Sequence, residues 1–335
     1  MLAVACILLV NLPLKAGAAA RSAFPASAPL AADHSSGFQI DAAHSGDQPN
    51  DPLTTPLTRR WSVDLGGPVS YPVIAGGLVF ATAGYAGGQG ARLYALDQGT
   101  GRTVWGPFDL GGGGWVSGLV YDAGKVFAVN EVGDLQAFDA TTGTRLWVKR
   151  ITLTDGTVRS APTALNGTLY VGSSQWVLYA LRESDGSELW HAPTNGAEYS
   201  SAAVSDGAVF QVYGCQESEA FAAPTGNPIW RNPPSCSTGT GTTPVVYYGR
   251  VYARESASGG PVLDASTGAT VGQFSAGPAP AFHGSMGYFV FGNALHAQPV
   301  GGTVDAWQFA GDGTIDTAPI IVSGTVFVGS TSGNL

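Results

Sequence analysis

The stretch ALDQGTGRTVW, residues 95–105, is followed forty-two residues later by AFDATTGTRLW, residues 137–147. The two stretches share an alanine, an aspartate, a threonine–glycine pair and a tryptophan at the same positions. Weaker copies keep part of the pattern Ala-x-Asp-x-x-Thr-Gly-x-x-x-Trp, and they lie at residues 180–190, 220–230, 262–272 and 297–307. Recurrence at a near-constant period indicates a fold built by repeating one supersecondary unit.

A second element, a glycine followed by a short apolar run that usually reads Gly-x-Val-aromatic, lies between these copies. It begins at Gly77, Gly124, Gly167, Gly207, Gly249, Gly287 and Gly324. A third element, Ser/Thr-x-Pro, precedes several of these glycines, and it begins at Ser70, Ser160, Thr242 and Thr317. Together the three elements define a unit of roughly 40 residues, the length of a β-propeller blade.

Each unit divides into four short strands. In the third unit these are residues 160–165, 167–173, 176–183 and 186–192, the last of which follows an Asp-Gly turn. No segment shows helical periodicity over eleven or more residues. The sequence therefore predicts an all-β fold, a β-propeller of four-stranded antiparallel blades. Seven blades are visible and the last is incomplete, so an eight-bladed parent is the alternative; residues 57–65 read as an orphan fourth strand that would complete the last blade.

The conserved spacing within each copy has a structural explanation. Glycine of the Thr-Gly pair supplies the backbone freedom of the turn between the third and fourth strands. The indole is expected to lie between adjacent blades, where it buries apolar area and its N–H finds a backbone carbonyl. The residues predicted to dock in this way are Trp105, Trp147, Trp190, Trp230 and Trp307.

The eleven-residue pattern resembles the tryptophan-docking motif of pyrroloquinoline-quinone-type propeller repeats, over about residues 61–335. The resemblance implies the fold more strongly than an activity, because such repeats build quinoprotein alcohol dehydrogenases, an outer-membrane assembly lipoprotein and other exported propellers. Those enzymes resemble one another in a vicinal cysteine pair and a calcium site. This sequence has no adjacent cysteines and no calcium-loop spacing. We therefore predict no cofactor, and keep pyrroloquinoline quinone with calcium as the alternative.

The composition bears on the class of partner and on the size of the core. Only 12% of the 335 residues are charged, 48 are glycine, and the formal net charge is −9. An acidic chain lacks the basic surface that neutralises phosphates, so a nucleic-acid partner is not expected. The hydrophobic share of 44% is enough for a large core.

The N-terminal region predicts export. Residues 1–20 read as a signal peptide with an apolar stretch and small residues at its end, although no positive charge precedes the stretch. Residues 21–56 read as a flexible tether, and residues 57–335 as the propeller. Cys215 and Cys236 remain after removal of the signal and are predicted to form a disulfide, with two free thiols as the alternative. We expect a secreted or cell-envelope monomer with no membrane span in the mature chain.

Ligands of propellers often bind where the inner strands begin, around the mouth of the central channel. Counting back from the recurring glycines places a mixed set of polar and aromatic side chains there: Trp115, Arg159, Glu198, Tyr199 and Asp316. These side chains either contact a peptide or sugar or fill the channel and pair with one another. The predicted function is a non-catalytic binding or scaffolding module for protein or glycan, and the alternative is a quinoprotein-type oxidoreductase.

Overall fold

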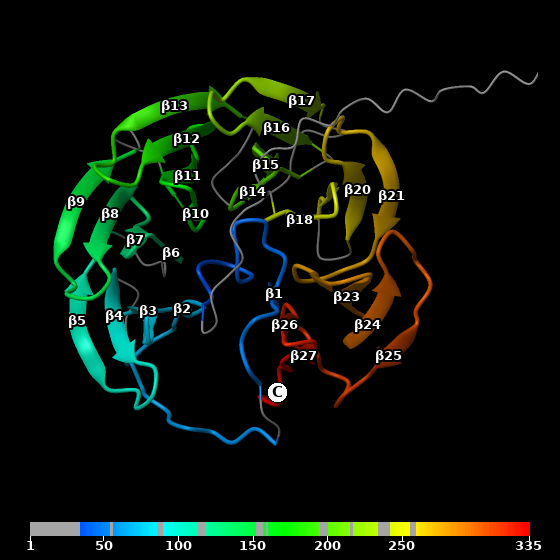
Figure 1. Ribbon diagram of the computed structural model, residues 1–335, viewed down its shortest axis with the longest axis horizontal. Helices are drawn as coiled ribbons and strands as arrows, with labels where there is room; N and C mark the ends of the chain where they lie inside the picture. The colour runs from blue at the N-terminus through cyan, green and yellow to red at the C-terminus, as the bar shows by residue number, and fades with distance from the viewer. Residues whose placement is uncertain are drawn as a thin grey trace, which may run out of the picture.

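The computed structural model describes residues 34–53, 56–85, 90–112, 118–151, 157–158, 160–194, 200–214, 217–233, 242–254 and 259–335. These residues form 27 strands and no helix. The strands make seven sheets arranged in a ring around a central axis (Figure 1). The sequence-based prediction of an all-β propeller with seven visible blades is therefore confirmed.

The first six sheets each contain four antiparallel strands, with the first strand innermost and the fourth outermost. The first three sheets are β2 (Val73–Ala75), β3 (Leu78–Gly84), β4 (Ala91–Asp97) and β5 (Thr103–Asp109); β6 (Leu119–Asp122), β7 (Lys125–Val129), β8 (Asp134–Asp139) and β9 (Arg145–Arg150); and β10 (Thr163–Leu165), β11 (Thr168–Ser173), β12 (Val177–Arg182) and β13 (Glu188–Pro193). The next three are β14 (Ala203–Ser205), β15 (Ala208–Val212), β16 (Ser218–Ala222) and β17 (Pro228–Asn232); β18 (Val245–Tyr247), β19 (Arg250–Tyr252), β20 (Gly260–Asp264) and β21 (Thr270–Phe274); and β22 (Ala281–His283), β23 (Met286–Phe291), β24 (Ala294–Pro299) and β25 (Trp307–Phe309).

The seventh sheet differs from the other six. Its three strands are β1 (Asp47–Gln48), β26 (Ile320–Val322) and β27 (Thr325–Phe327), and β1 lies parallel to β26. An N-terminal strand therefore joins the last sheet, but at its inner edge. The predicted closing strand at residues 57–65 forms no β-ladder with any described residue.

The first two strands of each sheet are joined by a two-residue turn that explains the Gly-x-Val-aromatic element. At Asn166 and Gly167 both residues have positive φ, 53° and 81°, as a type I′ hairpin requires. Glycine is the second turn residue, and the apolar strand starts directly after it. In the sixth sheet the positive-φ glycine is Gly284, whereas the predicted Gly287 lies inside β23.

The Thr-Gly pair closes the turn between the third and fourth strands. The Asp139 carboxylate accepts hydrogen bonds from the Thr142 backbone N–H at 2.8 Å and from its hydroxyl at 2.9 Å. Gly143 follows with φ of +71°, and a Cβ atom there would stand 2.7 Å from Cδ2 of Trp105. Glycine is thus required twice, by the backbone conformation and by the indole packed against it.

Indoles link each of the first four sheets to the next one in the ring. Trp105 and Trp190 are each 8% exposed, and their Nε1–H groups donate to the carbonyls of Ala140 and Ala223 at 2.9 Å. The same bond joins three further indole–carbonyl pairs: Trp61 to Gln98, Trp147 to Glu183 and Trp230 to Ala265.

Trp307 does not follow this pattern. Its side chain is 45% exposed, so the prediction that it docks between blades is wrong for this residue. The physical reason is that the described part of the seventh sheet ends with β27 and supplies no Thr-Gly turn beyond it.

Apolar cores lie between neighbouring sheets. In the first of them, Phe80 and Leu93 of one sheet pack against Leu119 and Val126 of the next, and all four are fully buried. Because each core is shared, no sheet could bury both faces alone, and hydrophobic burial holds the sheets in the ring.

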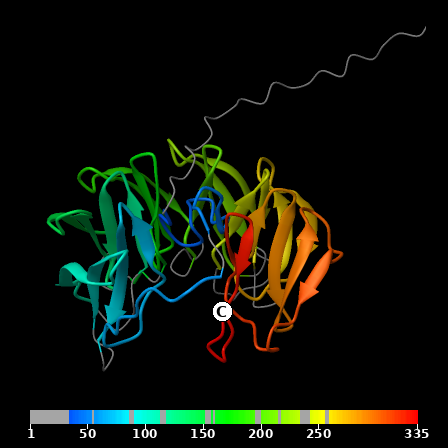
Figure 2. The same ribbon diagram turned by 60° about the horizontal axis from the view of Figure 1, so that its bottom comes forward.

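The prediction of a flexible tether over residues 21–56 is wrong for its ordered part. Residues 34–48, which we call the plug, lie in the centre of the ring (blue in Figures 1 and 2). Ile40, His44 and Gln48 are each less than 9% exposed. The plug stays in place because it makes hydrogen bonds that the inner strands would otherwise leave open.

Candidate functional site

The plug is bonded to the inner strands of six of the seven sheets, all except the third. In most of these strands a central residue turns its backbone N–H toward the axis and donates to a plug carbonyl. The donor–acceptor pairs are Ile74–Ser35, Tyr121–Ser36, Val204–Ala42, Val246–Ala43, Phe282–Ser45 and Ile321–Gly46, at 2.7–2.9 Å. Buried backbone groups need such partners, so the plug satisfies donors that face the channel.

The plug side chains satisfy acceptors at the start of the inner strands. His44 faces the carbonyl oxygen of Pro244 with Nδ1 at 2.8 Å, and the Gln39 amide donates to the carbonyls of Pro280 and Pro319. Pro244 and Pro319 are the prolines of two Ser/Thr-x-Pro elements. These elements therefore present carbonyl oxygens to the channel.

His44 is held neutral by its surroundings. Its side chain is 1% exposed, and burial lowers its pKa to about 4 despite the opposing bond to the Pro244 carbonyl. A neutral ring that faces a carbonyl must carry its proton on that nitrogen, which is Nδ1. His44 is therefore a fixed donor here, and it is not available as a base at neutral pH.

The backbone of the plug is constrained. Gln39, Ile40 and His44 have φ of 50°, 76° and 62°, in the left-handed region that L-residues disfavour. Gly46 also has positive φ, and a Cβ there would lie 2.6 Å from Cβ of Ala281. The contacts with the surrounding sheets maintain this conformation, so the segment is fitted to the channel.

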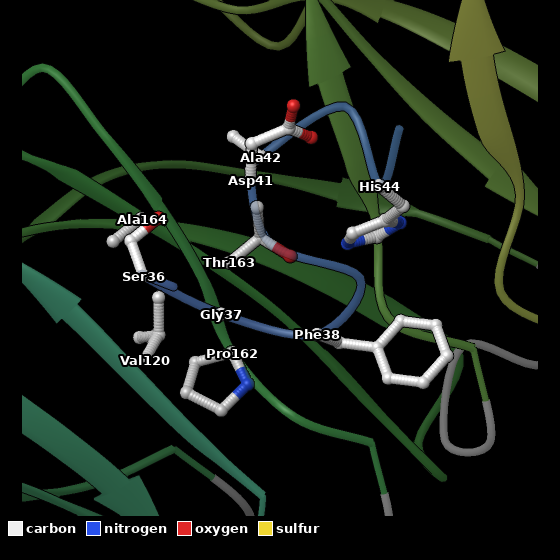
Figure 3. A pocket seen from close by; sticks show the side chains of 10 residues that line it. All are labelled: Ser36, Gly37, Phe38, Asp41, Ala42, His44, Val120, Pro162, Thr163 and Ala164. Atoms are coloured by element: carbon white, nitrogen blue, oxygen red, sulfur yellow. The ribbon is translucent and has the colours of Figure 1, made fainter. Parts of the chain in front are cut away.

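A small void lies where the plug passes the third sheet, the one sheet to which it makes no backbone bond among the described residues. Figure 3 shows its lining, with Phe38, Asp41 and His44 from the plug and Pro162 and Thr163 from the third sheet. Its volume is about 10 Å³, about the space of one water molecule. It is too small for a substrate or a cofactor.

A larger cavity, of about 390 Å³, lies at the junction of the first and seventh sheets. Its walls come from the plug, from the start of β2 and from β26, and they are mainly apolar: Phe38, Ile40, Pro72, Ile74, Ile320 and Val322. Gln39 also lines it, but its amide N–H groups are already engaged. Volumes of this size accommodate small ligands, and this cavity offers an apolar surface.

Of the predicted channel-mouth set, only Asp316 lies within the described residues. Trp115, Arg159, Glu198 and Tyr199 lie outside the described residues and stay predictions. Asp316 precedes β26, is exposed, and donates its backbone N–H to the Gly329 carbonyl at 3.2 Å. The predicted disulfide partners, Cys215 and Cys236, also lie outside the described residues.

Sequence reasoning missed the buried carboxyl groups of Glu183 and Glu219. Glu183 lies where the second and third sheets meet, and burial together with the neighbouring Asp122 raises its pKa to about 8. Glu219 lies in β16, where burial raises its pKa to about 7 against the opposing charge of Arg231. The other copies carry no charge at the position of Glu183, as in Ala140 and Ala223, so an acid at an otherwise uncharged repeat position was the available signal.

Two histidine–aspartate pairs are also present. His296 Nδ1 lies 2.8 Å from Asp305, and its Nε2 faces the Phe291 carbonyl, so both ring nitrogens are engaged. His283 Nδ1 lies 3.0 Å from Asp47 and ties the plug to the sixth sheet. Within the described ranges, no three His, Cys, Asp or Glu side chains are grouped as metal ligands. The His296–Asp305 pair lies within the sixth sheet, and neither pair lines a cavity.

Apolar side chains are exposed on and just before the outer strand of the sixth sheet. Phe309 is 56% exposed and Val304 78%, and they lie close in sequence to the exposed Trp307. We call Val304, Trp307 and Phe309 the seam. In the part of the chain that the structure describes, no helix is long and apolar enough to cross a membrane.

The repeats and the ring place the chain among known propellers. A family model described as Outer membrane protein assembly factor BamB (PQQ_2) matches residues 58–204 and 177–335. The chain belongs to this family. The resemblance predicted from the eleven-residue pattern is thereby confirmed.

Relatives in the PQQ_2 family are distant. The Outer membrane protein assembly factor BamB of Moranella endobia is 32% identical over 109 residues, which cover 30% of this chain and 28% of that protein. The chain thus matches less than a third of the length of this curated relative.

Solved structures share the fold at low sequence identity. BamB from Moraxella catarrhalis aligns over 77% of this chain and 80% of its own, with 15% identity and a TM-score of 0.59. Quinohemoprotein alcohol dehydrogenase ADHIIG from Pseudomonas putida aligns over 90% of this chain and 70% of its own, with 14% identity and a TM-score of 0.67. Because BamB and an alcohol dehydrogenase share this ring, the likeness concerns the fold alone.

Proposed function

We propose that this chain is a non-catalytic propeller that binds a protein partner and acts as a scaffolding module at or outside the cell surface. The observation that carries the proposal is the seam, where the apolar side chains of Val304, Trp307 and Phe309 are exposed within six residues of the chain. Clustered apolar surface of this kind is typical of interaction sites.

The filled channel supports recognition on the outside of the ring. Plug residues 34–48 occupy the axis and are bonded to six sheets, so a ligand at the axis would have to displace them. The partner surface is therefore the rim and the seam. The cell-envelope location rests on the predicted signal peptide and on the similarity to relatives named Outer membrane protein assembly factor BamB.

The alternative of a quinone-dependent oxidoreductase fits the chain poorly. The sequence holds cysteines at positions 6, 215 and 236, so the vicinal pair of those enzymes is missing. The channel axis is filled by Gln39 and His44, whose polar groups are already paired. We therefore propose no catalytic step that uses a quinone.

The test uses the full chain with a photocrosslinking residue at position 309 and, as a matched control, at Val104, which is similarly exposed on β5. In cell envelopes we expect one protein adduct from position 309 and none from position 104. Equal labelling from both sites, or dye reduction with alcohols or sugars after addition of pyrroloquinoline quinone and calcium, would overturn the proposal. Specific binding on a glycan array instead would establish carbohydrate as the ligand class.

A further inference from the structure

The plug carbonyls accept bonds from the sheets in the order of the chain. Residues 35 and 36 serve the first and second sheets, and residues 42 and 43 serve the fourth and fifth. The third sheet falls between these pairs, where residues 37–41 form a tight turn closed by the bond from the Ile40 N–H to the Gly37 carbonyl at 3.2 Å. Among the described residues, the order is therefore interrupted at the third sheet alone.

The third sheet nevertheless points a donor at the axis. Ala164 is the central residue of β10 and lies opposite Leu169, as Val204 is the central residue of β14 and lies opposite Val209. The Val204 N–H donates to the plug, so by the same register the Ala164 N–H faces the axis as well. No described residue accepts a bond from it, although Ala164 is only 8% exposed. A buried N–H group needs a partner.

The small void of the channel lies at this N–H group. Ala164 lines it together with Ser36, Asp41 and His44 of the plug (Figure 3). Its volume of about 10 Å³ is enough for one water molecule and for nothing larger. The unpaired donor and the space therefore coincide.

The wall of the void also carries acceptors. His44 has its proton on Nδ1, which faces the Pro244 carbonyl, so its Nε2 is an acceptor. The Asp41 carboxylate accepts bonds from the Ser45 N–H at 2.9 Å and from the Ser45 hydroxyl at 2.5 Å, and each oxygen keeps a further lone pair. A water molecule can accept one bond and donate two, whereas a metal cation cannot face an N–H donor.

We infer that this void binds one ordered water molecule, which joins the third sheet to the plug. The water accepts the bond from the Ala164 N–H and donates to the acceptors of Asp41 and His44. It supplies at the third sheet the acceptor that plug carbonyls supply at the other six, so the plug is bonded to all seven sheets. The inference concerns the closure of the channel and is independent of the partner proposed for the seam.

Water–amide NOE spectroscopy of the full, deuterated and nitrogen-15-labelled chain tests the inference. We expect a cross-peak between water and the Ala164 amide, and none at the Val204 amide, which is bonded directly to the plug. The peak should persist in S36A and T163V, which remove the two hydroxyl groups on the wall of the void. No peak at Ala164, or a peak that either variant abolishes, would overturn the inference.

The variant G37A places a methyl group on the wall of the void. Gly37 does not have positive φ, and its added Cβ would lie 3.4 Å from Cγ2 of Val120, an ordinary contact. Displacement of the water should abolish the cross-peak and speed exchange of the Ala164 amide at least about tenfold. G99A is the matched control, because Gly99 is equally unstrained and its nearest atom, on Asp97, is also at 3.4 Å. A peak that survives in G37A would place the water elsewhere and would contradict the inference.

A crystal soaked in a thallium salt separates water from a monovalent cation. We expect no anomalous peak in the void, because the Ala164 N–H repels a cation. A thallium peak beside Asp41 would assign the void to a cation and overturn the inference. The crosslinking experiment at position 309 is unaffected by either result, so the two proposals fail separately.

Discussion

Trp190 and Trp307 occupy the same position in two copies of one repeat, yet one is buried and the other exposed. Trp190 donates to the carbonyl of Ala223 and packs on Gly226, both from the next sheet. Trp307 has the same aromatic neighbour within its own sheet but no such turn beyond it. The comparison shows that a tryptophan docks only where the next sheet supplies a turn. The indole of one copy packs on the Thr-Gly turn of the following copy.

The largest expected effect comes from removing the indoles themselves. W190A should lower the free energy of unfolding by about 4 kcal/mol, because it empties a buried site of a large ring and leaves a carbonyl unpaired. W307A should lower it by less than about 1 kcal/mol, because its ring is partly solvated already. Urea unfolding of the two variants measures both values, and equal losses would remove the distinction between docked and open interfaces.

Substitutions at two turn glycines should separate the stability cost of crowding the indole from the cost of the backbone conformation. Gly226 and Gly167 both have positive φ, 70° and 81°, but only Gly226 has an indole against it. We expect G226A to cost about 3 kcal/mol and G167A about 1 kcal/mol, the cost of the backbone conformation alone. Thermal and urea unfolding provide the comparison. Equal losses of unfolding free energy would show that the indole contact adds nothing to the requirement for glycine at position 226.

Acid should weaken the plug. The pKa of His44 is lowered to about 4 in the folded chain, against 6.5 for the free side chain, so the unfolded state binds a proton that the folded state excludes. Stability from this group is complete above pH 6.5 and is lost as the pH falls toward 4. Between pH 7.5 and pH 5 we expect a loss of about 2 kcal/mol.

The variant H44N isolates this contribution, because its amide can donate to the Pro244 carbonyl but does not titrate. The difference in unfolding free energy between the native protein and H44N should therefore shrink on acidification by the amount stated. A difference that stays constant from pH 7.5 to pH 5 would show that His44 is solvated in the folded protein.

The smallest effect concerns the hydroxyl of the Thr-Gly pair. T142V removes a bond to Asp139 and should cost about 0.5–1 kcal/mol. T225V should cost less, because Ala222 replaces the aspartate in that copy and leaves no carboxylate for the hydroxyl. Urea unfolding of the matched pair resolves this, and a larger loss in T225V would assign the hydroxyl another role.

Much of the ring could be predicted from the sequence because its determinants are local. Asp139, Thr142 and Gly143 form their turn within five residues, and Asn166 with Gly167 sets a hairpin by itself. Repetition then identifies the sheets. The error at Trp307 arose because docking depends on a turn in the next copy, which the tryptophan itself does not encode.

The plug could not be predicted in the same way. Six plug residues accept bonds from the inner strands, each from a different sheet, with partners as far apart as Ile74 and Ile321, so the segment shows no periodicity. Its composition of small and polar residues is also that of a linker. Phe38 and Ile40, apolar residues within the supposed tether, were the one local sign of burial. The predicted channel-mouth site stays a prediction, because four of its five residues lie outside the described residues.

Hydrogen–deuterium exchange of the full chain tests the central claim most directly, that residues 34–48 close the axis of the ring. The amides of Ile40, His44 and Gly46 donate to carbonyls within the plug, and those of Val204 and Phe282 donate to plug carbonyls, so all five are expected to exchange as slowly as the amides of β15. Rapid exchange at these five amides would contradict the claim.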